Sequence, residues 1–224
     1  MPPGCLPLFI FVAFIIFIPL FFANAMLVAL GKLGLSPGTS LLAASGIFIG
    51  GMFNVPIKRI DRDEIIDVTP FSLFGFGRIF PQFLRRRTYT VIALNVGGCL
   101  VPAAIAVYEV FRLASLGPGV LLATIAAVVV NVAVCYWLAR PVPQLGIALP
   151  AIMPALVAAL CGLLFVPDMA PALAFVGGVA GPLIGADLLH LRQIERISTG
   201  VASIGGAGTF DGIVISALVA TLLA

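Results

Sequence analysis

Long apolar segments take up most of this sequence and limit the folds that it can adopt. Of its 224 residues, 62% are hydrophobic and only 9% are charged, whereas a soluble domain carries about 25% charged residues. A helix of about 20 apolar residues is long enough to cross the hydrocarbon core of a bilayer. We therefore expect an all-α polytopic membrane protein in which residues 1–224 form a single transmembrane domain within the lipid bilayer.

Seven apolar segments are predicted to be transmembrane helices. The second is short and rich in glycine, so it is expected to tilt or to enter the membrane only in part. The seven segments are residues 6–30, 38–53, 89–111, 119–138, 146–166, 170–189 and 203–224.

The positive charges predict how these helices are oriented, because loops rich in Lys and Arg stay in the cytoplasm. Seven alternating segments place ten basic residues on one side of the membrane and two, Lys32 and Arg112, on the other. We therefore expect a multi-pass protein of the cell (inner or plasma) membrane, with a cytoplasmic N-terminus and an external C-terminus. The ten cytoplasmic residues are Lys58, Arg59, Arg62, Arg78, Arg85, Arg86, Arg87, Arg140, Arg192 and Arg196.

The polar stretch 54–88 is too long for a simple turn between the second and third predicted helices. Apolar and polar residues alternate in part of its segment 57–65, IKRIDRDEI, as they do in a strand. We interpret the stretch as a small cytoplasmic element, a β-hairpin on the membrane surface. Its arginine run at 85–87 is expected to anchor the topology and to contact anionic lipids.

Two aspartates in apolar, glycine-rich surroundings are the strongest indication of function. Asp187 and Asp211 lie in predicted membrane helices, where an aspartate costs roughly 2.5–3.5 kcal/mol on insertion scales and usually has a function or a partner. The two helices are expected to be antiparallel neighbours, with both carboxyls at similar depth below the cytoplasmic surface. Two close carboxyls share a proton, so that one activates a water and the other polarises a carbonyl. This pattern predicts an intramembrane aspartyl-protease-like protein with these aspartates as its catalytic dyad.

Other polar and helix-breaking residues are expected at the same depth, around a cavity that opens to the cytoplasm. Glycines there would let helices approach closely and would leave backbone groups free to bind a ligand. The predicted supporting or substrate-binding residues are Asn54, Asn95, Gly97, Gly98, Pro154, Gly185, Gly205, Gly206, Gly208 and Thr209.

The remaining polar side chains indicate little further chemistry. The single histidine, His190, lies three residues from Asp187 and is within contact distance on a helix. Glu109 and Asp168 are expected in solvent near the outer ends of their helices. The four cysteines form no CxxC pair and no cluster with histidine, so we expect no metal and no other cofactor. No basic tract suits nucleic acid.

Two other functions fit the same aspartates. Intramembrane acids beside broken, glycine-rich helices are also typical of a proton- or ion-coupled transporter or channel for small molecules. In a third interpretation, nearby polar groups satisfy each aspartate, and the pair joins two helices of a non-catalytic membrane scaffold. The protease would take a transmembrane peptide as its substrate, and the sequence leaves this choice of function open.

Several motifs resemble those of a known family. They cover nearly the whole chain and are similar to an uncharacterised prokaryotic integral-membrane family, the domain-of-unknown-function family 1614, which implies no established activity. The motifs are FNVPI (53–57), NVGG (95–98), ARPV (139–142), IGADLL (184–189) and SIGGAGTFDGI (203–213).

The chain also resembles, more loosely, the intramembrane aspartyl proteases of the presenilin and signal-peptide-peptidase type. Those enzymes use one aspartate on each of two adjacent helices, the second in a GxGD motif, together with a PAL motif. Here GAGTFD (206–211) is similar to GxGD with two extra residues, and Asp187 stands where the first aspartate is expected. A PAL at 154–156 precedes both aspartates instead of following them. The resemblance implies the same acid chemistry at Asp187 and Asp211.

Overall fold

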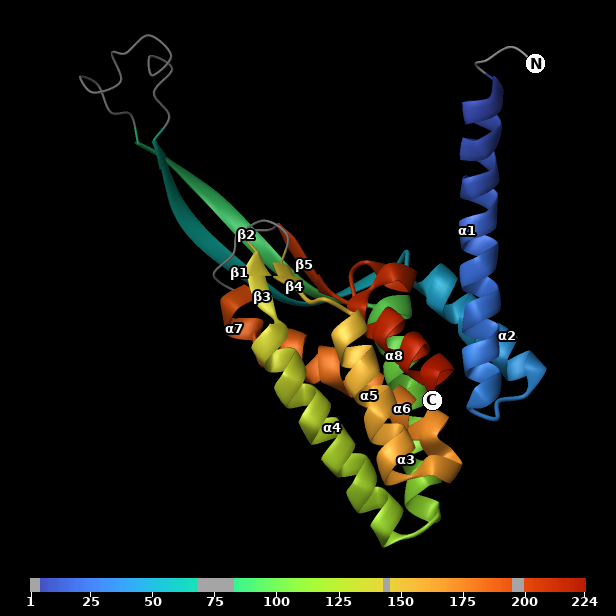
Figure 1. The fold of residues 1–224 in the computed structure, drawn as a ribbon. Helices are drawn as coiled ribbons and strands as arrows, with labels where there is room; N and C mark the ends of the chain where they lie inside the picture. Colours follow the sequence, from blue (N-terminus) through green and yellow to red (C-terminus); the bar gives the residue numbers. More distant parts are fainter. Residues whose placement is uncertain (1–4, 68–82, 143–145, 195–199) are drawn as a thin grey trace.

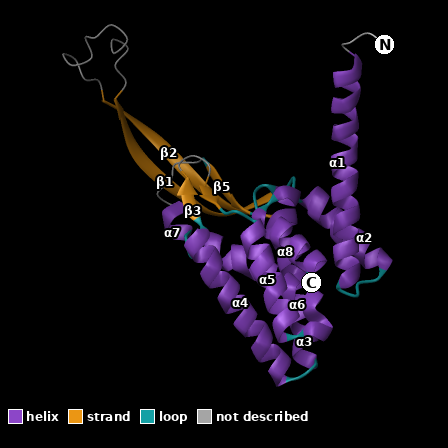
Figure 2. Ribbon diagram, viewed as in Figure 1, coloured by secondary structure: helices purple, strands orange, loops and turns teal. Residues whose placement is uncertain are grey.

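The computed structural model describes residues 5–67, 83–142, 146–194 and 200–224. A long β-hairpin projects from one end of a helical bundle, and the N-terminal helix stands beside the bundle (Figure 1). The described strands gather at that end, which we call the strand end (Figure 2). The α-helices are α1 (Cys5–Lys32), α2 (Pro37–Gly50), α3 (Val101–Ser115), α4 (Pro118–Leu138), α5 (Ile152–Phe165), α6 (Ala170–Ala180), α7 (Leu191–Ile194) and α8 (Gly212–Leu223). The strands are β1 (Asn54–Asp67), β2 (Phe83–Asn95), β3 (Arg140–Val142), β4 (Gly146–Ala148) and β5 (Val201–Ile204).

Short helical pieces of other types extend or interrupt these helices. Two are π-helical, with wider turns than an α-helix, and such segments are frequent at functional sites. They are η2 (Val96–Leu100), which leads into α3, and η4 (Gly181–Leu188), which continues α6. The 3₁₀ pieces are η3 (Pro167–Met169), before α6, and η5 (Gly208–Phe210), before α8.

Four helical segments are long and apolar enough to cross a membrane, judged by length and composition. They are residues 7–32, 96–115, 118–138 and 167–193. Three shorter apolar helices, α2, α5 and α8, have 14, 14 and 12 residues. The chain is therefore mostly helical and has the features of a membrane protein, but the expected seven transmembrane helices are not confirmed.

The expected β-hairpin is confirmed, and it is longer than the polar stretch that predicted it. β1 and β2 pair antiparallel in a register that places Asn54 opposite Asn95 and Asp67 opposite Phe83. Residues 89–95, which we expected to begin the third membrane helix, belong to β2, because their β-branched and aromatic side chains favour a strand. Residues 68–82 between the strands, with Arg78, lie outside the described residues, as does Arg196. A position on the membrane surface stays a prediction.

The seventh expected helix also begins later than predicted. Residues 201–204 form β5, which pairs parallel with β2 and extends the sheet in the order β1-β2-β5. Gly205 and Gly208 then adopt positive φ angles of 71° and 60°, which glycine reaches without the steric cost of a Cβ atom. The expectation of a helix from Ser203 was therefore wrong, and α8 starts at Gly212.

The fifth expected helix is shortened in the same way. Residues 146–148 form β4, which pairs antiparallel with β3 in a separate two-stranded sheet. Leu149 precedes Pro150, and a proline disfavours helical geometry in the residue before it. The α5 helix therefore begins only at Ile152.

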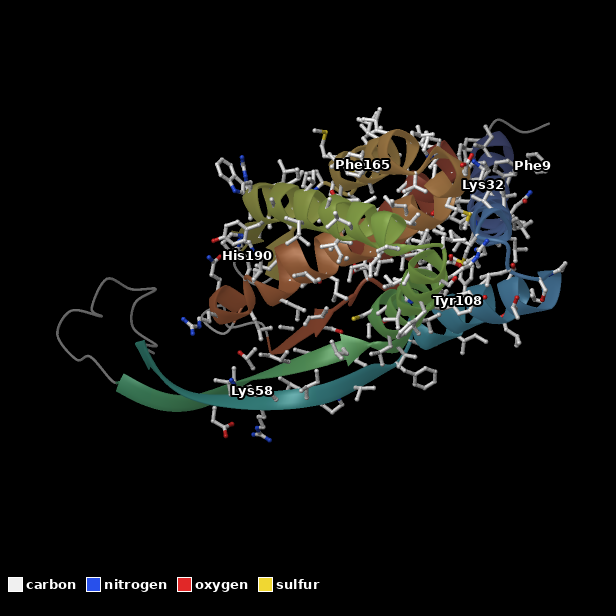
Figure 3. All side chains as sticks on the ribbon, turned by 90° about the horizontal axis from the view of Figure 1, so that it is seen from below. Phe9, Lys32, Lys58, Tyr108, Phe165 and His190 are labelled. Carbon is white, nitrogen blue, oxygen red and sulfur yellow. The ribbon has the colours of Figure 1, made fainter. Side chains whose placement is uncertain are left out.

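The centre of the bundle is α6, which α3, α4, α5 and α8 surround. Nine of its eleven residues are buried. Small residues allow this packing, since a Cβ atom on Gly178 would lie 2.7 Å from Cα of Ala217 in α8. In contrast, Phe9 near the start of α1 is 72% exposed (Figure 3). An exposed apolar face of this kind suits contact with lipid.

Candidate functional site

A partly polar cavity of about 620 Å³ lies at the strand end, and both aspartates contribute to its wall. Its wall combines the start of β1, the β4 segment, η4, the β5 segment with the turn that follows, and the start of α8. The lining residues are Asn54, Gly146, Ile147, Ala148, Leu149, Pro182, Ala186, Asp187, Val201, Ala202, Ser203, Ile204, Gly205, Gly206, Ala207, Asp211, Gly212 and Ile213. Segments far apart in the sequence thus bring the two predicted acids to one site.

Asp211 lies immediately before α8 and caps its N-terminus. Its Oδ1 accepts a hydrogen bond from the backbone N–H of Ile213 at 3.0 Å, and its Oδ2 accepts one from Ala207 at 3.3 Å. Aspartate is a favoured residue at this position because its oxygens satisfy free backbone donors. Burial raises the pKa of the Asp211 carboxyl, and the two backbone hydrogen bonds oppose this effect. The side chain is half-buried and positioned by its own loop.

Asp187 lies in the π-helical segment η4 and is also half-buried. Within the described part of the chain, no hydrogen bond or ion pair reaches its carboxyl group. It lines the same cavity as Asp211. Two carboxyls in one site cannot both ionise cheaply when they lie close together. Only Asp211 is held by backbone donors, so the two acids have different surroundings.

A hydrogen-bonded network supports the wall of the cavity beside the acids. Asn95 is fully buried and accepts a hydrogen bond from the backbone N–H of Gly98 at 2.7 Å. Its amide donates to the carbonyl of Gly51 and to Oδ1 of Asn54, at 2.8 and 3.1 Å. Ser203 on β5 donates to the same Asn54 oxygen at 2.5 Å. The network therefore fixes the end of α2, both hairpin strands and β5 to one another.

Glycines hold the same junction together by direct contact between backbones. A Cβ atom on Gly97 would lie 2.1 Å from the carbonyl oxygen of Ile47, and one on Gly98 would lie 2.0 Å from that of Gly205. Contacts below 3.0 Å with rigid backbone leave no room for a side chain. This close packing, which only glycine permits, places the turn before Asp211 against η2 and the end of α2.

Of the predicted residues, Asn54, Gly205 and Gly206 line the cavity together with both aspartates. Asn95, Gly97, Gly98, Gly208 and Thr209 are buried and are not among the residues that line the cavity. Two predictions place residues at the site that lie elsewhere. Gly185 packs on α4, where a Cβ atom would be 2.4 Å from the carbonyl oxygen of Val132, and Pro154 is buried in α5.

The sequence pattern does not identify residues 146–149 as part of the site, because so apolar a segment predicts the start of a helix. Gly146 has a positive φ of 104°, and Pro150 follows the segment. Glycine and proline at the two ends of a short apolar run are a signal for an extended segment, and they would have identified β4.

Two further expectations about polar residues need correction. His190 does not hydrogen-bond to Asp187, since its Nδ1 lies 3.1 Å from the carbonyl oxygen of Gly185 and its ring packs on Tyr136. Glu109 is fully buried and not in solvent. Arg112 pairs with its carboxyl at 3.2 Å and so compensates the buried charge. Asp168, by contrast, is exposed as expected. Among the described residues, no group of three or more His, Cys, Asp or Glu side chains could hold a metal ion.

The fold and the site together define a helical membrane protein with a pair of carboxyls in a partly polar cavity at the end of its bundle. The sequence model of the family described as "Protein of unknown function (DUF1614)" matches residues 48–223, which is most of the chain, and the protein belongs to this family. Comparisons with curated proteins and with solved structures gave no match.

Proposed function

We propose that this protein is an intramembrane aspartyl-protease-like enzyme that hydrolyses a peptide bond at the strand end, with Asp187 and Asp211 as its catalytic dyad. The observation that carries the proposal is that both carboxyls line one cavity. Neither acid is neutralised by a basic side chain within the described residues. A pair of this kind has the composition that acid–base hydrolysis requires.

The dyad would act with a single shared proton. The ionised carboxyl takes a proton from a water molecule, whose oxygen attacks the carbonyl carbon of the peptide bond, while the protonated carboxyl gives its proton to the carbonyl oxygen. As the C–N bond breaks, the carboxyl that took the proton from water gives it to the leaving amine. The other, now ionised, carboxyl removes a proton from one hydroxyl of the resulting gem-diol, which leaves the new carboxylic acid and restores the single shared proton. Because the two acids titrate as a unit, the activity is expected to depend on pH with two macroscopic pKa values that belong to the pair.

The backbone around the acids suits an extended peptide. β5 is at the edge of its sheet, and β4 pairs on one side with β3; among the described residues no strand occupies their other edges. Both strands line the cavity. A substrate segment that enters between them can form main-chain hydrogen bonds as an added strand. This pairing would hold the segment around the scissile bond in an extended conformation instead of a helix.

The resemblance to the presenilin and signal-peptide-peptidase type supports the same assignment. The turn that contains GAGTFD (206–211) leads directly to the helix that Asp211 caps. Asp187 lies on the preceding long apolar segment. The strand end is also where Lys58, Arg140 and Arg192 lie. The positive-inside rule therefore favours a cytoplasmic site, a cytoplasmic N-terminus and an external C-terminus in the cell membrane.

Cleavage of a transmembrane reporter peptide by the purified protein in detergent tests the proposal. Asp187→Asn and Asp211→Asn should each lower the cleavage rate by at least about 100-fold, because each removes one partner of the acid–base pair. Asp168→Asn is the matched control, since this exposed acid lies at the opposite end of the same long apolar segment. Unchanged cleavage in either dyad variant would remove that aspartate from the mechanism.

A proton- or ion-coupled transporter is the second candidate. The π-helical segments η2 and η4 belong to two of the long apolar segments, and broken helices beside acids are typical of ion-coupling sites. This function predicts solute uptake driven by a pH gradient in proteoliposomes, and its loss in the Asp187→Asn variant. Cleavage without such uptake would exclude it.

A scaffold role for the pair is favoured by one contact, the capping of α8 by Asp211. It predicts that Asp211→Asn, which keeps an oxygen for the cap, has no effect in the cleavage assay or the uptake assay. Loss of either activity in this stable variant would contradict a purely structural role.

A further inference from the structure

Asn54 is an uncharged polar residue in the wall of the acid cavity, at the first position of β1. Its side chain is exposed, whereas its neighbour Asn95 is fully buried. An asparagine amide has an accepting oxygen on one side and an NH₂ group with two donors on the other. Which of the two faces the cavity decides what Asn54 can bind.

The surrounding hydrogen bonds determine this orientation, starting from the backbone. The N–H group of Gly98 can only donate, so the Asn95 atom that it contacts at 2.7 Å is the oxygen Oδ1. The NH₂ group of Asn95 therefore faces the other way, toward the carbonyl oxygen of Gly51 at 2.8 Å and toward Asn54 at 3.1 Å. The carbonyl of Gly51 can only accept, which independently requires the same orientation of Asn95.

The orientation of Asn54 follows from that of Asn95. A donor faces Asn54, so the atom of Asn54 on that side is its oxygen, and Ser203 donates to the same oxygen at 2.5 Å. Both lone pairs of Oδ1 then have donors. The NH₂ group lies on the opposite side of the amide, and no acceptor within the described residues takes a hydrogen bond from it.

We infer that the Asn54 NH₂ group binds a backbone carbonyl oxygen of an extended peptide that lies in the cavity. This inference rests on the proposed function, because it takes the peptide of that reaction as the ligand. It adds a substrate-binding residue to the dyad and assigns its role as a hydrogen-bond donor. Ser203 and Asn95 act through Asn54, by holding its amide with the donors outward.

The position of Asn54 suits this task. It is opposite Asn95 in the hairpin ladder, and its partner Ser203 lies on the edge strand β5. A peptide added to the free edge of β5 would leave some of its carbonyl groups without a partner from that strand. Asn54 lies across β2 from β5 in the sheet, and it lines the cavity, where its NH₂ group can satisfy a peptide carbonyl that β5 leaves free. An unsatisfied buried carbonyl would weaken binding.

The test measures binding of a synthetic peptide to the full-length protein in detergent. The peptide combines a transmembrane helix of about 20 leucine and alanine residues with a flexible tail of small apolar residues. It is labelled with a fluorophore, and binding is measured on the Asp187→Asn background so that it cannot be cleaved. Asn54→Ala should weaken binding about 3- to 10-fold, the range for one lost neutral hydrogen bond. Asn54→Asp keeps acceptors for Asn95 and Ser203 but loses the donors, so it should weaken binding at least as much.

A thioamide scan of the peptide tail separates direct contact from a structural effect. Replacing one carbonyl oxygen by sulfur weakens it as an acceptor. At one tail position, the thioamide should weaken binding to the protein that keeps Asn54 and should leave binding to the Asn54→Ala variant unchanged. Ser203→Ala is the matched control: it removes one holding contact but keeps the NH₂ group, so the loss should be smaller than for Asn54→Ala and the thioamide effect should remain.

The outcomes distinguish this inference from the proposed function. The inference would be overturned if the Asn54 variants bound the peptide as tightly as the protein with Asn54. It would also be overturned if every thioamide weakened binding equally with and without Asn54. In either case the dyad could still be active. Binding with the expected coupling, but without cleavage by the wild-type protein, would support the inference and overturn the proteolytic function. A peptide that does not bind the wild-type protein at all would overturn the inference.

Discussion

The acidic side chains at the two ends of the helical bundle have different partners. At the end away from the strands, Glu109 is fully buried and pairs with Arg112, which also donates to the carbonyl of Leu33. At the strand end, Asp187 has no such partner among the described residues and lines one cavity with a second acid. A buried acid that serves stability is given a counter-charge. An acid placed beside another acid is set up for proton chemistry, and this difference singles out the strand end as the site.

The two ends are also held together differently. The Glu109–Arg112 pair joins α3 to the segment after α1 through side chains. The strand end is joined through backbone contacts of glycines and through the Asn95 network. Backbone contacts leave the carboxyl groups of the site free, since no charged side chain is needed to hold the elements together.

The largest effect is expected at the glycine junction. Gly98→Ala would place a methyl group 2.0 Å from the carbonyl oxygen of Gly205, so we expect a loss of more than about 4 kcal/mol of unfolding free energy, or failure to fold. Gly31→Ala in α1 is the control, because nothing lies within 4 Å of its new methyl group and alanine favours a helix by up to about 1 kcal/mol. SDS titration of both purified variants provides the measurement. Equal stabilities would show that the junction is not rigid.

The next largest effect concerns the paired acid. Arg112→Leu leaves the buried Glu109 carboxyl without its counter-charge, and we expect a loss of about 3 kcal/mol, the low end for a buried pair because the Arg112 side chain is partly exposed. The double variant Glu109→Leu/Arg112→Leu should recover at least half of that loss, because no isolated charge remains buried. Unfolding titrations of the single and double variants measure the coupling. If the double variant is as unstable as Arg112→Leu, the pair does not act as a unit.

A smaller effect is expected at the cap of α8. Asp211→Ala removes the acceptors for Ile213 and Ala207 and should lower the unfolding free energy by about 1 kcal/mol. Asp211→Asn keeps an accepting oxygen and should cost much less, while it abolishes cleavage. Thermal unfolding and the reporter assay on the same preparations compare the two roles. If Asp211→Asn lost both stability and cleavage, the capping role and the catalytic role of Asp211 could not be separated.

The smallest effect on stability is expected at the unpaired acid. Asp187→Asn removes a charge that no described residue compensates, so the unfolding free energy should stay within about 0.5 kcal/mol of the wild type or rise. Glu109→Gln, the same chemical change at the other end, should cost about 1.5 kcal/mol because it weakens a charge-assisted hydrogen bond. Comparison of the two unfolding curves is the measurement. A large loss at Asp187 would place it among the structural acids.

Much of the fold could be predicted from local sequence. Long apolar runs such as 6–30 and 119–138 predicted helices, because a helix satisfies its own backbone in any apolar solvent. The hairpin was predicted from its polar alternation. The errors came where a strand is itself apolar: residues 89–95, 146–148 and 201–204 are hydrophobic enough to continue a helix. Their strand conformation depends on pairing partners that no local window contains.

The amino-acid sequence by itself identified Asp187 and Asp211, because an acid in so apolar a chain is costly and stands out. It also predicted Asn54 and the glycines of the junction to be supporting or substrate-binding residues. Only the tertiary structure decided which acid is paired and which is free. The sequence predicted Glu109 in solvent, but the packing of segments distant along the chain buries it together with its neighbour Arg112. The orientation of the Asn54 amide, with its oxygen toward Asn95 and Ser203, also depends on the fold, since these donors from β2 and β5 meet only in the folded protein.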